Sequence, residues 1–375
     1  MNRAAAEPGP RLLFAGGGTG GHIVPARNLA ERVDPEGGGR VHFLTAGRPV
    51  EEAFFREAPW PCTPLFPPEG KRPPLHAPGA WAAALRRARA VRNRFRPHVL
   101  FLLGGYVSLP SLLALLGTGI PRYALEPNAV PGRAARLTAP FCRRVFCHFP
   151  AAARRLGRRA VVTGSPLSRG FGRSRERRDE TRRALGLAPG LPTLLVAGGS
   201  QGARALNERI TAAFPLLARA LGGRLQLLHV TGLRDYPAVR AAWERGGVKG
   251  AVHPFLDPME PAYAAADLVL CRGGAMTVAE VSAAGLPAVI VPYPHHKDRH
   301  QYENARELVE EGGARLLEEG EMTPEGTARL LEELFRDPAR LARMARAARR
   351  AARTDGAERI LSFLEKDLEG DPEMG

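Results

Sequence analysis

Short apolar runs alternate along this chain with longer stretches in which apolar residues recur at helical spacing. Runs of roughly four to eight apolar residues bounded by glycine or proline predict buried strands, and the stretches between them predict helices. Strands that alternate with helices form a parallel sheet covered on both faces. In the first half of the chain the predicted strands are residues 11–15, 41–45, 99–103, 122–126, 145–148 and 161–163.

The same pattern restarts in the second half of the chain. The predicted strands there are residues 193–197, 225–231, 251–254, 268–271 and 288–292. A charged, arginine-rich stretch at residues 170–181 separates the two series, as a linker would. Residues 338–368 are rich in Ala and Arg at helical spacing and predict one closing helix. The chain therefore predicts two α/β domains, each doubly wound.

Composition and charge limit the number of domains and the kinds of partner that the chain can have. A length of 375 residues suits two domains of ordinary size. The net charge of +16 favours an anionic partner, such as a nucleotide or an acidic membrane surface. No nucleic-acid partner is expected, because no recognition-helix motif and no basic–aromatic platform is found. The four cysteines match no metal-binding or CxxC spacing, and no metal or cofactor is expected.

The N-terminal segment lacks the apolar core and cleavage site of a signal peptide. Residues 107–121 are apolar but too short to span a bilayer. These features predict a soluble or peripheral protein rather than an integral one.

A glycine-rich turn, GGGTGGH at residues 16–22, follows the first strand and precedes a helix. Glycines let the backbone approach an anion closely, and the helix N-terminus offers unpaired N–H groups. The spacing satisfies G-x-G-x-x-G, yet the second strand ends Thr45-Ala46-Gly47-Arg48, without the acid that a nicotinamide cofactor needs. A dinucleotide-dependent oxidoreductase is therefore disfavoured. His22 lies at the mouth of this turn and is a candidate general base.

Other polar and glycine-rich turns follow later strands. They are GGYVS at 104–108, EPN at 126–128, GGSQGAR at 198–204, CRGGAMTVAE at 271–280 and HKDRHQYEN at 296–304. All fall at the carboxyl ends of predicted parallel strands, where open α/β sheets bind ligands. The amides near residues 275–277 can cap a diphosphate, Glu280 can accept hydrogen bonds from a ribose, and the 296–304 run suits a sugar.

These turns, in this order and spacing over residues 12–304, resemble the MurG family of peptidoglycan glycosyltransferases. The resemblance implies two Rossmann-like parallel-sheet domains that face each other across a cleft, the GT-B type of α/β fold. It implies an inverting transfer of GlcNAc from UDP-GlcNAc to the MurNAc of lipid I, which gives lipid II. The first domain would be residues 1–166 with a helix at about 353–370, and the second would be residues 167–352.

The resemblance also assigns residues to roles. His22 is the candidate base and Glu126 the second candidate. The substrate-binding residues would be Thr19, Gly20, Gly21, Asn128, Arg169, Ser200, Gln201, Leu256, Ala275, Met276, Thr277, Val278, Ala279, Glu280, His300 and Gln301. Among these, Leu256 would meet the uracil through its backbone, Glu280 the ribose, and Gln301 with His300 the GlcNAc. This chain departs from the family pattern in three places. Leu125-Glu126-Pro127-Asn128 replaces His-Glu-Gln-Asn, and Gly273 replaces Ser. Gly164-Ser165-Pro166-Leu167-Ser168-Arg169 replaces Gly-Asn-Pro-Val-Arg, so that the arginine is displaced by one residue.

The alternatives are other UDP-sugar enzymes of the same fold, such as a UDP-GlcNAc 2-epimerase. A basic segment beginning at Trp81 distinguishes them, because Trp81, Leu85, Ala88 and Arg92 share one helical face among clustered arginines. Such a helix can lie on an anionic leaflet, although an ordinary surface helix fits the pattern equally well. The expected location is the cytoplasmic face of the cell membrane, as a peripheral protein, with other cell-wall synthesis proteins as possible partners.

Overall fold

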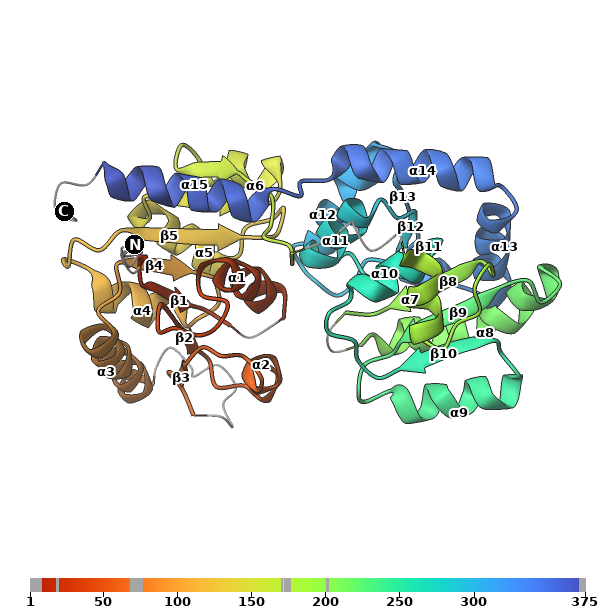
Figure 1. The fold of residues 1–375 in the computed structure, drawn as a ribbon, viewed down its shortest axis with the longest axis horizontal. Coiled ribbons are helices and arrows are strands. Elements are labelled where there is room, and N and C mark those ends of the chain that lie inside the picture. The colour runs from red at the N-terminus through yellow and green to blue at the C-terminus, as the bar shows by residue number, and fades with distance from the viewer. Residues whose placement is uncertain are drawn as a thin grey trace, which may run out of the picture. The chain divides into compact units, whose positions relative to one another are not determined.

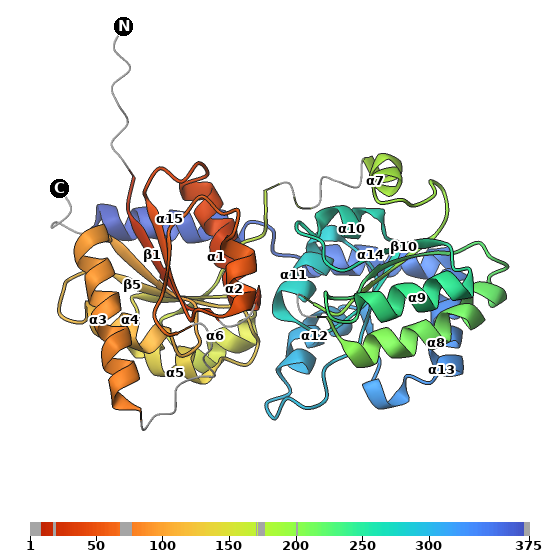
Figure 2. The same cartoon turned by 90° about the horizontal axis from the view of Figure 1, so that it is seen from below.

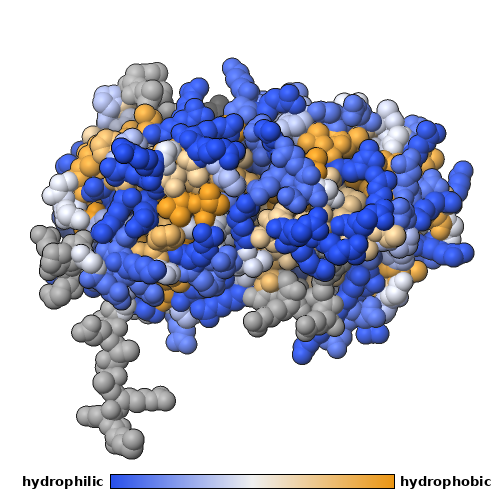
Figure 3. Space-filling view, turned by 90° about the horizontal axis from the view of Figure 1, so that it is seen from above, coloured by the Kyte–Doolittle hydropathy of each residue, from blue (hydrophilic) through white to orange (hydrophobic). Residues whose placement is uncertain are grey.

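The computed structural model describes residues 9–17, 20–67, 77–169, 171, 177–199 and 202–370. The chain divides into two compact units, each described by itself below. Unit 1 comprises Met1–Leu167 and Asp355–Gly375, and unit 2 comprises Ser168–Thr354. Helices flank the sheet of each unit (Figure 1, Figure 2). Hydrophilic side chains predominate on the side of each unit that is shown in Figure 3.

Within the described residues, unit 1 contains one sheet of seven parallel strands in the order β3-β2-β1-β4-β5-β6-β7. The strands are β1 (Leu12–Ala15), β2 (Val41–Thr45), β3 (Cys62–Pro64), β4 (Val99–Leu102), β5 (Arg122–Glu126), β6 (Arg144–Cys147) and β7 (Ala160–Val162). The strand order reverses between β1 and β4, so the carboxyl ends of these two strands form the switch point at which such sheets bind ligands.

The helices of unit 1 cover both faces of this sheet. They are α1 (Gly20–Val33), α2 (Pro49–Phe55), α3 (Pro78–Phe95), α4 (Ser108–Leu115), α5 (Arg133–Thr138), η1 (Ala139–Phe141), α6 (Pro150–Leu156) and α15 (Gly356–Glu369). Side chains alternate along β1: Leu12 and Phe14 join a core with residues of α1 and α15, whereas Leu13 and Ala15 join a core with residues of α3 and α4.

Unit 2 repeats the plan with six parallel strands in its described part, in the order β10-β9-β8-β11-β12-β13. The strands are β8 (Thr193–Ala197), β9 (Gln226–Val230), β10 (Gly250–His253), β11 (Leu268–Cys271), β12 (Ala288–Ile290) and β13 (Ala314–Leu316). The helices are α7 (Arg178–Ala184), α8 (Arg204–Ala220), α9 (Tyr236–Gly246), α10 (Glu260–Ala265), α11 (Ala275–Ala284), α12 (His300–Glu310), η3 (Glu319–Glu321), α13 (Pro324–Phe335) and α14 (Pro338–Ala351). Here the switch point lies between β8 and β11.

The prediction of two parallel-sheet α/β domains is confirmed. The predicted single closing helix is wrong, because the chain leaves helical geometry at residues 352–355 and forms α14 and α15 instead. α14 packs on α11, α12 and α13 in unit 2. α15 packs in unit 1, where both carboxylate oxygens of Asp367 accept hydrogen bonds from Arg144 at 2.8 Å.

The predicted membrane-facing side of the Trp81 segment is also wrong. Ala84 and Ala88 of α3 are buried in unit 1, and Trp81 and Leu85 pack against the same core. The apolar face of α3 therefore serves the interior of unit 1, and its arginines Arg86 and Arg89 are exposed. Among the described residues, no helix combines the length and the apolarity needed to cross a bilayer.

Candidate active site

The switch point of unit 1 is built by two glycine turns in backbone contact. A Cβ placed on Gly16, after β1, would lie 2.5 Å from the Cβ of Leu103, after β4. A Cβ placed on Gly105 would lie 3.0 Å from the carbonyl oxygen of Gly17, and Gly105 has a φ of +71°. Side chains at these positions would separate the turns. The predicted residue Thr19 lies outside the described residues, and Gly20 and Gly21 open α1.

His22 lies in the first turn of α1 and faces the second glycine turn. A Cβ placed on Gly104 would lie 3.5 Å from its Nε2 atom. The imidazole is half-buried. The structure therefore places the candidate base at the switch point of the sheet, where a ligand of unit 1 is expected.

Glu126, at the end of β5, is 4 % exposed. Its Oε1 atom accepts hydrogen bonds from the backbone N–H and the side-chain amide of Asn128, at 2.9 and 3.3 Å. Its Oε2 atom accepts from the N–H of Gly132 at 3.1 Å. Burial raises the pKa of Glu126 to about 7, although these hydrogen bonds oppose the shift. The carboxylate thus holds the 127–132 loop in place, including the half-buried Asn128.

Sequence reasoning missed Glu51, whose carboxylate packs against Gly17 in the first glycine turn. This buried residue accepts hydrogen bonds from the N–H groups of Arg48, at 2.8 Å, and Ala46, at 3.3 Å. A Cβ placed on Gly17 would fall 1.9 Å from its Oε1 atom. The signal was present, because Pro49 at the first helical position with Glu51 two residues later is a helix-start pattern.

The switch point of unit 2 is also built by two glycine-containing turns, one after β8 and one after β11. After β8, a Cβ placed on Gly198 would lie 2.5 Å from the backbone nitrogen of Ala203, so the turn folds back tightly onto the start of α8. The predicted residues Ser200 and Gln201 lie outside the described residues. After β11, Gly274 caps α11 in an extended conformation.

The first turn of α11 presents backbone rather than side chains. Met276, Val278 and Ala279 are buried with Ala275, and Thr277 is half-buried. The N–H of Val278 donates to the carbonyl of Gly274 at 2.9 Å, which is the first bond of the helix. The N–H groups of residues 275–277 have no partner inside the helix and carry the positive end of its dipole. Amide groups at a helix N-terminus can bind an anion such as a diphosphate.

Glu280 lies one turn further along α11 and is half-buried. Its Oε2 atom accepts a hydrogen bond from the hydroxyl of Tyr263, at 2.9 Å, and Tyr263 is itself buried. Burial raises the pKa of Glu280 to about 7; the bond from Tyr263 opposes the shift, and the nearby carboxylates of Glu260 and Asp257 add to it. Leu256 is half-buried directly before Asp257, so the predicted uracil and ribose contacts lie in the same part of unit 2.

Arg169 is exposed. The residue before it, Ser168, donates a short hydrogen bond to Glu260 on α10. This contact places Arg169 beside the helix that follows the Leu256 loop.

The predicted sugar-binding residues open α12. Gln301 accepts a hydrogen bond through Oε1 from the N–H of Tyr293 at 2.9 Å. A Cβ placed on Gly273 would lie 2.3 Å from the carbonyl oxygen of Gln301, so glycine at this position lets α12 approach the turn after β11. Asn304 completes the join by donating to the carbonyl of Gly273 at 3.1 Å. His300 is half-buried beside them.

Arg272 was missed by sequence reasoning and supports this region from the core. Its buried guanidinium donates to the carbonyls of Val291 and Pro292, at 3.1 and 3.3 Å, and pairs with Glu319. The loop that leads to His300 is therefore tied to unit 2 at its base. In the described part of the chain, one group of histidine and acidic side chains is placed to hold a metal ion: His296, Asp298 and His300.

Comparisons with known proteins identify the family of the chain. The chain matches the glycosyltransferase family 28 N-terminal domain over residues 12–147 and the family 28 C-terminal domain over residues 193–360. It is 39 % identical to the UDP-N-acetylglucosamine–N-acetylmuramyl-(pentapeptide) pyrophosphoryl-undecaprenol N-acetylglucosamine transferase of Nocardioides sp., over 94 % of this chain and 97 % of the relative.

The transferase of the same name from Acidothermus cellulolyticus is 40 % identical, over 95 % of this chain and 97 % of the relative. The crystal structure of Acinetobacter baumannii MurG has 28 % identity and a TM-score of 0.70, and the match covers 96 % of this chain and 100 % of that one. The chain therefore belongs to glycosyltransferase family 28, in the group of UDP-N-acetylglucosamine–N-acetylmuramyl-(pentapeptide) pyrophosphoryl-undecaprenol N-acetylglucosamine transferases.

Proposed function

We propose that this enzyme moves GlcNAc from UDP-GlcNAc to the MurNAc of lipid I and so makes lipid II for peptidoglycan synthesis. The observation that carries the proposal is the α11 site in unit 2, where helix amides and the Tyr263-bound carboxylate of Glu280 lie one turn apart. The amides suit a diphosphate, and a carboxylate close by suits the hydroxyls of an attached ribose. The names of the relatives supply the same donor and acceptor.

In this proposal unit 2 binds the donor. The N–H groups of residues 275–277 bind the diphosphate, and the ionised carboxylate of Glu280 accepts hydrogen bonds from the ribose hydroxyls. The backbone of Leu256 meets the uracil. Gln301 and His300 bind the GlcNAc, and Arg169 serves the donor from beside α10.

Unit 1 supplies the general base. The MurNAc hydroxyl attacks the anomeric carbon of GlcNAc while the bond from that carbon to the diphosphate oxygen breaks, so the configuration inverts in one displacement. His22 takes the proton from the hydroxyl. UDP leaves with its added negative charge stabilised by the α11 amides and helix dipole. Glu126 is the less suitable base, because both of its oxygens accept hydrogen bonds from the 127–132 loop.

Radiolabel transfer tests the reaction. Purified enzyme with radiolabelled UDP-GlcNAc and a lipid I analogue is expected to give a labelled disaccharide lipid and an equal amount of UDP. The epimerase alternative predicts instead that UDP-GlcNAc is converted without any acceptor. Epimer formation with no labelled lipid would overturn the proposal.

We also propose that unit 1 docks on an anionic membrane at the cytoplasmic face of the cell membrane, through exposed apolar residues on and beside α4 and η1. The exposed fractions are 39 % for Leu109, 43 % for Leu113, 40 % for Leu116, 66 % for Leu137 and 47 % for Phe141. The basic residues Arg133, Arg136 and Arg143 are exposed in the same segment. Exposed apolar side chains together with exposed arginines suit a leaflet with acidic head groups.

Vesicle flotation tests the docking surface. We expect the enzyme to float with vesicles rich in phosphatidylglycerol, and we expect Leu113→Asp with Leu137→Asp to remove most of that binding. Leu233→Asp, at an exposed leucine of unit 2, is the matched control and should float normally. Equal flotation of all three proteins would refute the assignment to unit 1.

A further inference from the structure

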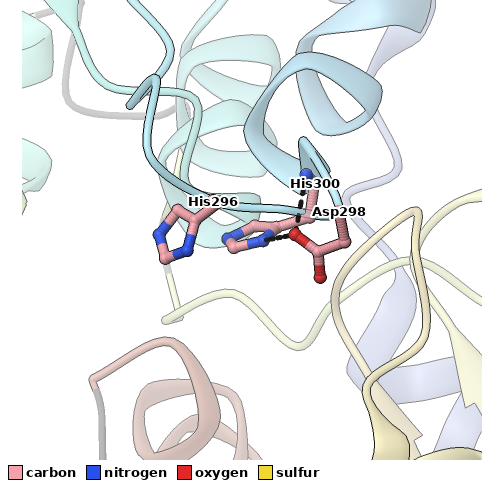
Figure 4. Close-up of side chains that lie close together, drawn as sticks. All are labelled: His296, Asp298 and His300. Atoms are coloured by element: carbon pink, nitrogen blue, oxygen red, sulfur yellow. Dashed lines mark hydrogen bonds and ion pairs between the residues drawn. The ribbon is translucent and has the colours of Figure 1, made fainter.

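The loop between β12 and α12 gathers three side chains that the transfer reaction does not require as a group. His296, Asp298 and His300 project toward one another (Figure 4), and their ligand atoms all lie within 4.8 Å of one another. The Nδ1 atom of His300 lies 2.8 Å from Oδ1 of Asp298. The ring centroids of His296 and His300 are 4.2 Å apart.

We propose that His296, Asp298 and His300 form a binding site for a borderline divalent cation such as Zn²⁺. Two imidazoles with one carboxylate are a ligand set that these ions favour. Zinc bonds to such ligands are about 2.0–2.2 Å long, so neighbouring ligand atoms in a tetrahedral shell are roughly 3.3 Å apart. Small rotations of the side chains reach that spacing from the positions observed, and water supplies the fourth ligand.

The Nδ1 atom of His300 and the Oδ1 atom of Asp298 are at hydrogen-bond distance, about half an ångström closer than neighbouring ligands in a tetrahedral zinc shell. A cation that binds both atoms replaces this hydrogen bond. The neutral imidazole then carries its one proton on Nε2.

The backbone holds the three residues in this arrangement. Arg299 has a φ of +48°, which is unusual for a residue other than glycine. The turn formed here, with the N–H of Arg299 donating to the carbonyl of His296 at 3.0 Å, brings the residues on either side together. A strained backbone of this kind is found where a site is pre-shaped. The anchors of Arg272 and Gln301 fix the two ends of the loop.

The surroundings permit a cation. The guanidinium of Arg299 lies 4.0 Å from the centroid of the Tyr302 ring and 3.8 Å from a carboxylate oxygen of Glu318. Its charge is therefore engaged by these two groups. Lys297 is exposed, so water screens its charge. Asp298 is exposed as well, which leaves the site open to ions in solution.

Occupancy of the site has a consequence that rests on the proposed function. His300 is one of the residues proposed to bind the donor GlcNAc. A cation that takes the lone pair of His300 removes this side chain from the sugar, so the metal and UDP-GlcNAc should compete. The site would then make the enzyme sensitive to free Zn²⁺.

Metal binding is tested first on the tag-free, full-length chain without any substrate. Co²⁺ serves as the probe because its visible absorption reports ligands directly. We expect one Co²⁺ per chain, displaced by Zn²⁺, and at least about tenfold weaker binding in His296→Ala and in Asp298→Asn. His295→Ala removes the adjacent histidine outside the cluster and is the matched control, with unchanged affinity expected. Equal Co²⁺ affinity in the wild type and in a His296→Ala/His300→Ala double variant would overturn the site.

The competition is tested second, by the donor KM with and without Zn²⁺. Zn²⁺ should raise the donor KM in the wild type and in His295→Ala, and leave it nearly unchanged in His296→Ala. Co²⁺ binding with no change in donor KM would overturn the competition alone. Absence of any transfer activity, with Co²⁺ binding intact, would instead count against the proposed function and leave the metal site standing.

Discussion

The two switch points use glycine in different ways. In unit 1 the glycines belong to two turns that touch each other, as Gly105 does against the carbonyl of Gly17. In unit 2 a glycine folds one turn back on itself, as Gly198 does against Ala203. The turns of unit 1 are therefore mechanically coupled, and a change in one should displace the other. The two turns of unit 2 instead pack on other neighbours: Gly202 lies against the carbonyl of Thr231 after β9, and Gly273 lies against the carbonyl of Gln301 in α12.

The two units also differ in the kind of chemical group that they bring to the switch point. Unit 1 brings a side chain, His22, to its switch point, whereas unit 2 brings the backbone N–H groups that open α11 and keeps the side chains of Met276 and Val278 buried. A side chain can exchange a proton, and a row of backbone dipoles binds a negative charge without changing its own state. This contrast supports the assignment of the proton transfer to unit 1 and of the leaving diphosphate to unit 2.

Among the substitutions that distinguish the roles of the two units, His22→Ala should have the largest effect on activity. Loss of the proposed general base should lower kcat by about 10²–10⁴-fold, while the affinity for UDP, whose binding we assign to unit 2, stays the same. Steady-state transfer and calorimetric titration with UDP measure the two quantities. His98→Ala, a substitution directly before β4 at the opposite edge of the sheet, should change neither. A kcat within a few-fold of wild type for His22→Ala would return the base assignment to Glu126.

The close packing of Gly17 on Glu51 predicts that Gly17→Ala destabilises the fold. The new methyl would displace Glu51 from its bonds to Ala46 and Arg48, at a cost of about 1–3 kcal/mol in the free energy of unfolding. Urea denaturation measures this cost. Gly132→Ala introduces a methyl with no atom within 4 Å and is the control. Equal stability of both variants would show that Glu51 can move aside without cost and does not support the first glycine turn.

Among the described residues, each unit contains one buried or half-buried carboxyl whose pKa is raised to about 7: Glu126 in unit 1 and Glu280 in unit 2. The folded chain keeps protons that the unfolded chain loses near pH 4.5. Stability from this source is complete below that pH and is lost as the pH rises through about 7. For Glu126 the loss is of the order of 3 kcal/mol, and for the more exposed Glu280 it is smaller.

Urea denaturation at several pH values between about 5 and 8 tests this slope. Glu126→Gln should flatten it more than Glu280→Gln does. A slope that persists in the double variant would place the titration elsewhere in the chain.

The smallest effect is expected for Tyr263→Phe. This substitution removes the Tyr263 hydroxyl, and with it the hydrogen bond that orients Glu280 and favours its charged form. The donor KM should therefore rise about three- to tenfold with little change in kcat. The KM should also depend more steeply on pH near neutrality. Tyr236→Phe, on α9, is the matched control. A fall in kcat at constant KM would contradict an indirect role for Tyr263 through the ribose-binding carboxylate.

Much of the fold was readable because its signals are local. Apolar runs gave most strands, and the glycine turns mark the ends of β1, β4, β8 and β11, the four strands that flank the two switch points. The three-residue strands β3 and β13 were missed, since Cys62–Pro64 and Ala314–Leu316 offer too few apolar residues to form a run. Their pairing depends on a neighbouring strand already in place.

The supporting residues were harder to predict. Glu51 and Arg272 are buried charged residues whose partners are backbone atoms and distant side chains. The residues next to them in the sequence do not indicate which partners these are. The apolar stripe of α3 was visible, but periodicity does not tell whether such a stripe meets lipid or a protein core. Only the packing of Trp81 and Leu85 against unit 1 decided between them.

The placement of α15 has a consequence for how the protein is made. Ala357, Ile360 and Leu364 complete a core whose other members lie in the first half of the chain. A ribosome must therefore produce all of unit 2 before residues 356–369 emerge and unit 1 can close. Until then the nascent unit 1 exposes an apolar face that chaperones would recognise. Ribosome stalling before α15 should yield a chain in which the later-synthesised unit is folded and the earlier one is not.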